Sequence, residues 1–294
     1  MGITRRAALK TMLAGGAAVA GVSAATTSAS AAPLDAPPDA LGLLYDATLC
    51  IGCKTCVVKC QEANHLEPDL KGIDAKYDAP LSLSANAKTV IKLYRDDASG
   101  DTSFMKAQCM HCIDPACVSA CMIGALTKGR NGIVSYNVDY CVGCRYCEIA
   151  CPFNVPKFQW ASSTPQIVKC ELCRERLGEG KQPACTEVCP RHAVIFGARS
   201  DLLQEAKRRI AEAPDTYQPK VYGETEAGGT QCLYISHVPF DKLGLPTLDD
   251  RPAPDLARSI QHTVYKGFIA PVVLYGALGM VMLRNRRAAE KPEA

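Results

Sequence analysis

The hydrophobic pattern places one long apolar stretch near each end of the chain. One runs from about 12 to 25, behind two arginines, and the other covers 267–283 without a charged residue. At about 1.5 Å per residue, the second stretch falls slightly short of a hydrocarbon core about 30 Å thick. Starting at Thr263, with Lys266 reaching back to the interface, supplies the missing turn. We therefore expect a membrane helix over about 263–283, with a buried helix of a soluble domain as the alternative.

Between these stretches the apolar runs are short and are separated by glycine, proline and polar residues. A Gly-Arg-Asn-Gly segment at 129–132 is a strong hairpin signal between two such runs. The expected elements are strands at 90–95, 125–127, 133–136 and 194–196 and a longer helix at 201–212. This mixture of short strands and helices predicts an α+β, ferredoxin-like fold.

The first 31 residues resemble a twin-arginine signal peptide. Arg5 and Arg6 precede the apolar stretch, and the small residues at 29–31 suit a cleavage site. Basic residues directly after the second stretch predict a cytoplasmic C-terminus, which leaves the middle of the chain on the periplasmic side. The expected organisation is a signal peptide at 1–31, a cysteine-rich domain at 32–255, and a membrane anchor with a cytoplasmic basic tail at 256–294.

Cysteine departs most from ordinary composition. The 294 residues include 17 cysteines, while aromatic residues make up only 6%. A chain of this length can bury an apolar core, but this composition indicates that inorganic centres replace part of it. Sixteen of the cysteines form four blocks, which are Cys50, Cys53, Cys56 and Cys60; Cys109, Cys112, Cys117 and Cys121; Cys141, Cys144, Cys147 and Cys151; and Cys170, Cys173, Cys185 and Cys189.

The spacing within the blocks is typical of proteins that bind 4Fe-4S clusters. Three cysteines spaced C-x2-C-x2-C surround one cluster, and the fourth points away toward another. Gly52 and Gly143 suit this turn, since backbone that passes close to sulfur often needs a positive φ. Blocks one and three echo each other in sequence, as do blocks two and four. The sequence therefore predicts four 4Fe-4S clusters, with short helices between the cysteines or after the fourth cysteine of a block.

Two other uses of cysteine are the alternatives. Exported proteins favour disulfides, and the wider spacing of block four would also suit zinc. Four repeated tetrads argue against both. The formal net charge of +3 counts every thiol as neutral, whereas each cluster with four thiolates carries roughly two negative charges when oxidised. A loaded protein should therefore be acidic, and a nucleic-acid partner is not expected.

Residues outside the tetrads support weaker predictions. Cys232 is expected to be a small buried residue in a strand, and His111 to be structural or to support a ligand. Positive side chains beside the cysteines would favour the reduced clusters, or would simply be solvated; they are Lys54, Lys59, Arg145 and Lys169. Residues at the membrane boundary could approach a quinone or anchor the interface; they are His262, Tyr265 and Lys266.

The segments beside the cysteines resemble those of a known family. They are 44–46, 108–112, 151–157, 228–231 and 260–267. With the signal peptide and the single tail helix, they resemble the HybA-like four-cluster ferredoxin-type subunits of periplasmic, membrane-bound NiFe hydrogenases, within the DMSO reductase iron-sulfur subunit superfamily. This resemblance implies tandem bacterial-ferredoxin-like modules, each with two 4Fe-4S clusters.

The resemblance also implies a nested pairing of the blocks, one with four and two with three. The implied ligands are Cys50, Cys53, Cys56 and Cys189 (group 1); Cys60, Cys170, Cys173 and Cys185 (group 2); Cys109, Cys112, Cys117 and Cys151 (group 3); and Cys121, Cys141, Cys144 and Cys147 (group 4). Sequence spacing alone leaves the pairing open.

In function, the resemblance implies an electron-transfer subunit without a catalytic site of its own. Its partners would be the large and small subunits of a NiFe hydrogenase, an integral membrane quinone-reactive subunit and, through the C-terminal helix, membrane lipid. It would lie on the periplasmic side of the cytoplasmic membrane. The alternative is the iron-sulfur subunit of a periplasmic molybdopterin oxidoreductase, such as a formate dehydrogenase or an oxyanion or sulfur reductase.

Overall fold

The computed structural model describes residues 36–68, 80–98 and 100–289. All seventeen cysteines lie within these ranges, in the compact unit Pro33–Pro254. The signal peptide expected at 1–31 lies outside the described residues. The C-terminal helix belongs to a second unit and is described separately below.

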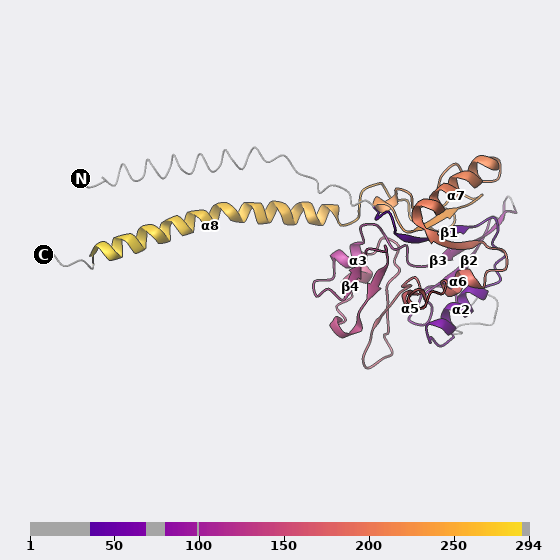
Figure 1. The fold of residues 1–294 in the computed structure, drawn as a ribbon, viewed down its shortest axis with the longest axis horizontal. Coiled ribbons are helices and arrows are strands. Elements are labelled where there is room, and N and C mark those ends of the chain that lie inside the picture. Colours follow the sequence, from indigo (N-terminus) through magenta and orange to yellow (C-terminus); the bar gives the residue numbers. More distant parts are fainter. Residues whose placement is uncertain (1–35, 69–79, 99, 290–294) are drawn as a thin grey trace. The chain divides into compact units, whose positions relative to one another are not determined.

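A three-stranded sheet brings together segments that are far apart in the sequence. Its central strand is β1 (Leu41–Asp46), which pairs antiparallel with β8 (Val194–Ala198) and parallel with β9 (Cys232–Ile235). Helix α7 (Arg199–Glu212) packs against all three strands (Figure 1). The helix predicted at 201–212 is therefore confirmed, with two further residues at its start.

The packing of α7 explains why this amphipathic segment is helical here. Its Leu202 and Ala206 are buried and belong to one apolar core with Leu44 of β1 and with Leu233 and Ile235 of β9. Leucines spaced along a helix face can cover alternate residues of a neighbouring strand. The sheet and α7 therefore form the part of the unit that relies on ordinary hydrophobic burial.

Three antiparallel hairpins complete the strands of the described residues. They are β2 (Val90–Arg95) with β3 (Thr102–Ala107), β4 (Leu126–Lys128) with β5 (Val134–Tyr136), and β6 (Lys157–Phe158) with β7 (Ile167–Val168). The predicted strands at 90–95, 125–127, 133–136 and 194–196 are confirmed to within two residues at each end. Strand β3 was not predicted, because polar residues interrupt its apolar pattern.

The short α-helices lie at the cysteine blocks, and the two 3-10 helices of the described residues lie outside them. The α-helices are α2 (Thr55–Ala63), α3 (Ala116–Ser119), α4 (Tyr146–Ala150), α5 (Arg174–Gly178) and α6 (Ala184–Glu187), and the 3-10 helices are Val138–Tyr140 and Glu226–Gly228. All but α5 among the five α-helices contain the third cysteine of a block, and α5 lies between the second and third cysteines of block four. Of the two positions predicted for the short helices, the one between the cysteines is therefore confirmed for α3, α4, α5 and α6, and α2 begins there and runs past Cys60. After the fourth cysteine, three blocks turn through a positive φ, at Gly124, Asn154 and His192, a conformation that a regular helix does not adopt.

All four blocks share one local backbone conformation. The residue before the second cysteine has a positive φ in every block, namely Gly52 (69°), His111 (48°), Gly143 (71°) and Leu172 (54°). The sequence analysis expected this conformation at the two glycines, and it is confirmed there. Its presence at a histidine and a leucine shows that the turn is imposed by the block as a whole.

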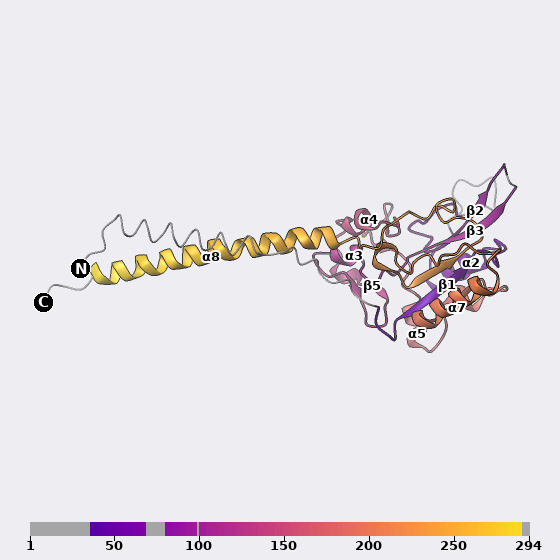
Figure 2. The same ribbon diagram turned by 90° about the horizontal axis from the view of Figure 1, so that it is seen from above.

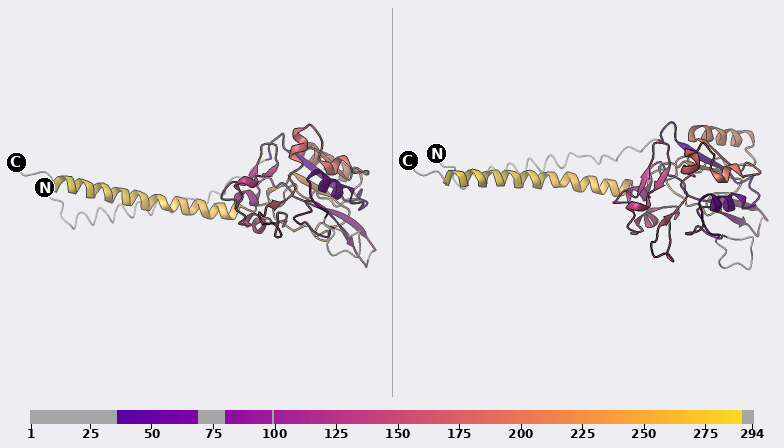
Figure 3. Two further views of the ribbon diagram at one scale, coloured as in Figure 1. Left: turned by 90° about the horizontal axis from the view of Figure 1, so that it is seen from below. Right: turned by 60° about the horizontal axis from the view of Figure 1, so that its bottom comes forward.

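The blocks separate into two halves of the unit. Helix α2 packs against α6, and α3 packs against α4. In Figures 1 and 2, α3, α4, β4 and β5 lie on one side, and α2, α5, β2 and β3 lie on the other. The views of Figure 3 show the same separation. Blocks one and four thus share one half, and blocks two and three share the other.

Helix α8 (Asp255–Ala289) is longer than the predicted span of 263–283. Within it, Gly267–Arg286 is the one stretch of the described helices long and apolar enough to cross a membrane. Pro271 lies inside the helix, a position that membrane helices tolerate. An apolar helix in this region is therefore confirmed, and its crossing of a membrane stays a prediction.

The two block glycines provide a matched test of the turn. A Cβ at Gly52 would lie 2.2 Å from the Phe104 ring, whereas one at Gly143 would lie 3.4 Å from Phe158. Alanine at either position has a left-handed strain of about 1–2 kcal/mol, and only Gly52→Ala adds overpacking of roughly 1–3 kcal/mol. We expect a lower thermal midpoint of unfolding for Gly52→Ala than for Gly143→Ala. The loss of visible absorbance on heating measures both midpoints. Equal midpoints would show that Phe104 moves aside freely.

Candidate iron-sulfur sites

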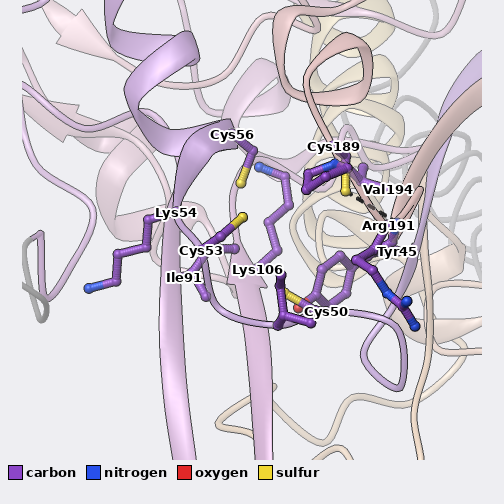
Figure 4. Close-up of a pocket in the computed structure, with 13 residues that line it drawn as sticks. Tyr45, Cys50, Cys53, Lys54, Cys56, Ile91, Lys106, Cys189, Arg191 and Val194 are labelled. Atoms are coloured by element: carbon purple, nitrogen blue, oxygen red, sulfur yellow. Dashed lines mark hydrogen bonds between the residues drawn. The ribbon is translucent and has the colours of Figure 1, made fainter.

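The four cysteines of group 1 line a single cavity. Cys50 and Cys53 follow β1, Cys56 lies in the first turn of α2, and Cys189 follows α6. Figure 4 shows their sulfur atoms arranged around the side chain of Lys106. Two segments more than 130 residues apart therefore contribute to one space lined by sulfur.

Donors reach several of these sulfur atoms. The backbone amide of Ala193 donates to Cys189 Sγ at 3.2 Å, and Thr55 Oγ1 donates to Cys53 Sγ at 3.4 Å. In group 2, the amide of Leu172 donates to Cys170 Sγ at 3.4 Å. Hydrogen bonds to sulfur favour the thiolate and are one of the means by which a protein sets the potential of an iron-sulfur cluster.

The thiols of group 2 are also close neighbours. Burial raises the pKa of Cys60, and the thiols of Cys170, Cys185 and Cys173 raise it further. Cys60 comes from α2, whereas the other three come from block four. The packing of α2 against α6 is what brings them together.

Groups 3 and 4 come from blocks two and three. Burial raises the pKa of Cys112, and the neighbouring thiols of Cys109, Cys151 and Cys117 raise it further. In group 4, burial raises the pKa of Cys147 to about 11, with contributions from the neighbouring thiols Cys144, Cys121 and Cys141. Each neighbourhood draws three thiols from one block and the fourth from the other.

Thiols of successive groups also influence each other, which arranges the groups in a series. The thiol of Cys56 (group 1) raises the pKa of Cys185 (group 2). The thiol of Cys170 (group 2) raises that of Cys109 (group 3), and Cys147 (group 4) raises that of Cys117 (group 3). The order is therefore 1, 2, 3, 4, and the exposed cysteines Cys53 and Cys144 belong to the two ends.

The donor set suits iron-sulfur clusters. All seventeen cysteines are free thiols, and within the described residues no three His, Cys, Asp or Glu side chains are placed to hold a single metal ion. Burial raises the pKa of Cys185 and of Cys117 to about 12, although Lys106 and Lys169 respectively act in the opposite direction. These thiols are therefore protonated in the metal-free chain at neutral pH, and binding of iron must displace their protons.

The positive residues that the sequence analysis named beside the cysteines differ in their surroundings. Lys169 is buried, and its Nζ donates to the carbonyl oxygens of Val134 and Cys170. Lys59 instead pairs with Glu62 at 3.0 Å, with 41% of its side chain exposed. The guanidinium of Arg145 lies 4.5 Å from the centre of the Trp160 ring. For Lys59, the interpretation as a solvated residue is therefore correct.

Lys54 and His111 each adopt a left-handed backbone conformation. Lys54 precedes α2 with a φ of 58° and is partly buried. His111 is fully buried, and its Nδ1 accepts a hydrogen bond from the Val134 amide at 3.0 Å. Burial and the nearby Lys169 and Lys128 hold the pKa of His111 well below its ordinary value, so the ring is neutral. The predicted structural role of His111 is therefore confirmed.

Cys232 occupies the first position of β9 and is fully buried. Its Sγ donates to the carbonyl oxygen of Cys109 at 3.2 Å. This confirms the prediction of a small buried residue in a strand. The membrane-boundary residues His262, Tyr265 and Lys266 lie in α8, but their side chains lie outside the described residues.

Sequence reasoning missed Lys106. This residue of β3 is fully buried and shares the cavity of group 1. In sequence it precedes block two, yet its nearest thiols are Cys56, Cys60, Cys170 and Cys185, of blocks one and four. The available signal was a lysine inside a short apolar strand next to a cysteine block, which is weak without the fold.

Comparisons with known proteins identify a 4Fe-4S domain and related iron-sulfur subunits. A model of the 4Fe-4S dicluster domain matches residues 101–199. The chain is 41% identical over 283 residues to the hydrogenase-2 operon protein HybA of Escherichia coli O157:H7, covering 85% of this chain and 86% of that protein. It is also 37% identical over 199 residues to the iron-sulfur subunit of the nitrate-inducible formate dehydrogenase of Escherichia coli K12, covering 66% and 67%. A formate dehydrogenase iron-sulfur subunit of Haemophilus influenzae is 33% identical over 245 residues, covering 81% and 77%.

Proposed function

Because this chain belongs to the HybA family of 4Fe-4S iron-sulfur subunits, we propose that it conducts electrons from a NiFe hydrogenase to a membrane quinone-reactive subunit through four 4Fe-4S clusters. The observation that carries this proposal is the continuous series of four cysteine groups, with an exposed cysteine at each end. When bound, such a cluster accepts and returns one electron at a time. The chain itself would have no catalytic site.

The sixteen cysteines of groups 1 to 4 are the proposed ligands. Helices α2 and α6 would hold groups 1 and 2 in one ferredoxin-like module, and α3 and α4 would hold groups 3 and 4 in another. The amides and hydroxyl that reach the sulfur atoms would orient the ligands and favour their thiolates. Five of the sixteen cysteines are buried, nine are half-buried, and only Cys53 and Cys144 are exposed.

The proposed location is the periplasmic face of the cytoplasmic membrane. A twin-arginine signal at Arg5 and Arg6 would export the folded chain, and the apolar stretch Gly267–Arg286 of α8 would anchor it in lipid. Arg284 and Arg286 end this stretch, which favours a cytoplasmic C-terminus. The partners in this arrangement are the large and small hydrogenase subunits and the quinone-reactive membrane subunit.

A molybdopterin oxidoreductase is the second candidate partner, and it is favoured by the similarity to two formate dehydrogenase subunits. Purification of the native complex in mild detergent distinguishes the two. We expect nickel in the complex and, once the iron of the partner subunits is subtracted, about sixteen irons per copy of this chain, four for each cluster. Molybdenum without nickel would contradict the hydrogenase assignment and would identify the partner as a molybdopterin oxidoreductase. A colourless chain without iron would contradict both.

A further inference from the structure

Lys106 carries a buried ammonium that hydrogen-bonds to one side chain of the described residues. Its Nζ donates to Thr89 Oγ1 at 2.5 Å, and Thr89 in turn donates to the carbonyl oxygen of Ala107. Lys106 and Thr89 are both buried. Among the described residues, no carboxylate forms an ion pair with Lys106. A hydroxyl cannot neutralise a buried positive charge, which costs several kcal/mol when it is left unpaired.

The sulfur atoms of two cysteine groups are the nearest source of negative charge. Lys106 lines the cavity of group 1, where Figure 4 places it among the four sulfur atoms. The thiols of Cys60, Cys170 and Cys185 of group 2 also act electrostatically on Lys106. Because Cys56 of group 1 and Cys185 of group 2 are also neighbours, the ammonium lies where the two groups meet.

We propose that Lys106 is a positive charge shared by the first two clusters of the series, and that it raises the reduction potential of both. This inference rests on the proposed four-cluster function. Reduction of a cluster adds one negative charge, so a nearby ammonium stabilises the reduced state relative to the oxidised state. The site is buried, so salt screens this attraction weakly. Thr89 positions the ammonium through its hydroxyl.

The test compares two lysines that differ in their surroundings. Lys106→Met removes the shared charge and keeps much of the side-chain volume. Lys59→Met is the matched control, because Lys59 lies next to Cys60 in sequence but is partly exposed and pairs with Glu62. Both variants and the wild type are purified as the native complex, analysed for iron and sulfide, and titrated with redox mediators while electron paramagnetic resonance follows the clusters.

In Lys106→Met, we expect the equilibrium constants for reduction of two of the four clusters to fall at least tenfold. For a one-electron couple, a tenfold fall lowers the reduction potential by about 59 mV. The other two couples and all four in Lys59→Met should stay at the wild-type values. The inference is overturned if no couple moves, if only one moves, if all four move alike, or if Lys59→Met gives the same shift.

Iron analysis separates failure of this inference from failure of the proposed function. About sixteen irons per chain with unmoved potentials would reject the role of Lys106 alone, whereas wild-type protein without clusters would reject both. If Lys106→Met does not retain clusters, the same titration is carried out on Lys106→Arg, because arginine keeps the positive charge. Retained clusters with two couples within tenfold of wild type support the inference, whereas loss of clusters from this variant too would assign Lys106 to packing and overturn it.

Discussion

Replacing Cys173 and Cys185 together with alanine is expected to reduce the iron content from about sixteen to about twelve atoms per chain, since each cluster holds four irons. Only two of the four group 2 cysteines remain in this variant, which is too few to hold a cluster. Because cluster binding contributes folding free energy, the thermal midpoint should fall as well. The first effect is measured as the loss of about four irons per copy of this chain relative to the wild-type complex, by iron and sulfide analysis of both preparations. Loss of visible absorbance on heating measures the second.

Cys232→Ala is the matched control for this prediction. Cys232 is as deeply buried as any cysteine of the tetrads, but its Sγ donates to a backbone carbonyl. We expect the control to keep about sixteen irons. Loss of a cluster from the control would make Cys232 a ligand, and full iron content in the double variant would exclude Cys173 and Cys185 as ligands.

Asp46→Ala is expected to destabilise the sheet by about 3–5 kcal/mol, the usual result of breaking a buried ion pair. The Asp46 side chain is fully buried, and its Oδ2 accepts from Arg209 Nη1 at 3.0 Å and from the Tyr217 hydroxyl at 2.9 Å. Its Oδ1 accepts from the amide and hydroxyl of Thr48. Removal of the carboxylate leaves Arg209 without this partner and releases the end of β1 from α7. The thermal midpoint should fall by roughly 10 °C.

Lys207→Met supplies the comparison for the Asp46 variant. Lys207 is also on α7, but its ion pair with Glu224 is exposed. Such pairs contribute at most about 1 kcal/mol, so this variant should unfold close to the wild-type temperature. Similar midpoints for the two variants would show that the Asp46 pair does not hold β1 to α7.

The sequence predicted the local features of the cysteine blocks well, because these depend on neighbouring residues. The hairpin around 129–132, the positive φ at Gly52 and Gly143, and the helix at 201–212 all follow from short-range sterics or periodicity. Local pattern left two positions open for the short helices, between the cysteines or after the fourth, and the structure places α3, α4, α5 and α6 between the cysteines. The turn after the fourth cysteine, as at Asn154, was not foreseen.

By itself, the sequence determined the four cysteine blocks and the kind of cofactor that they predict, since regular spacing along the chain is enough to recognise a block. Only the tertiary structure decided which blocks share a space, that the groups form a series, and that Lys106 lies between the first two. These relations depend on contacts between segments that are far apart in the chain. Their spacing along the sequence carries no information about which of them pack together.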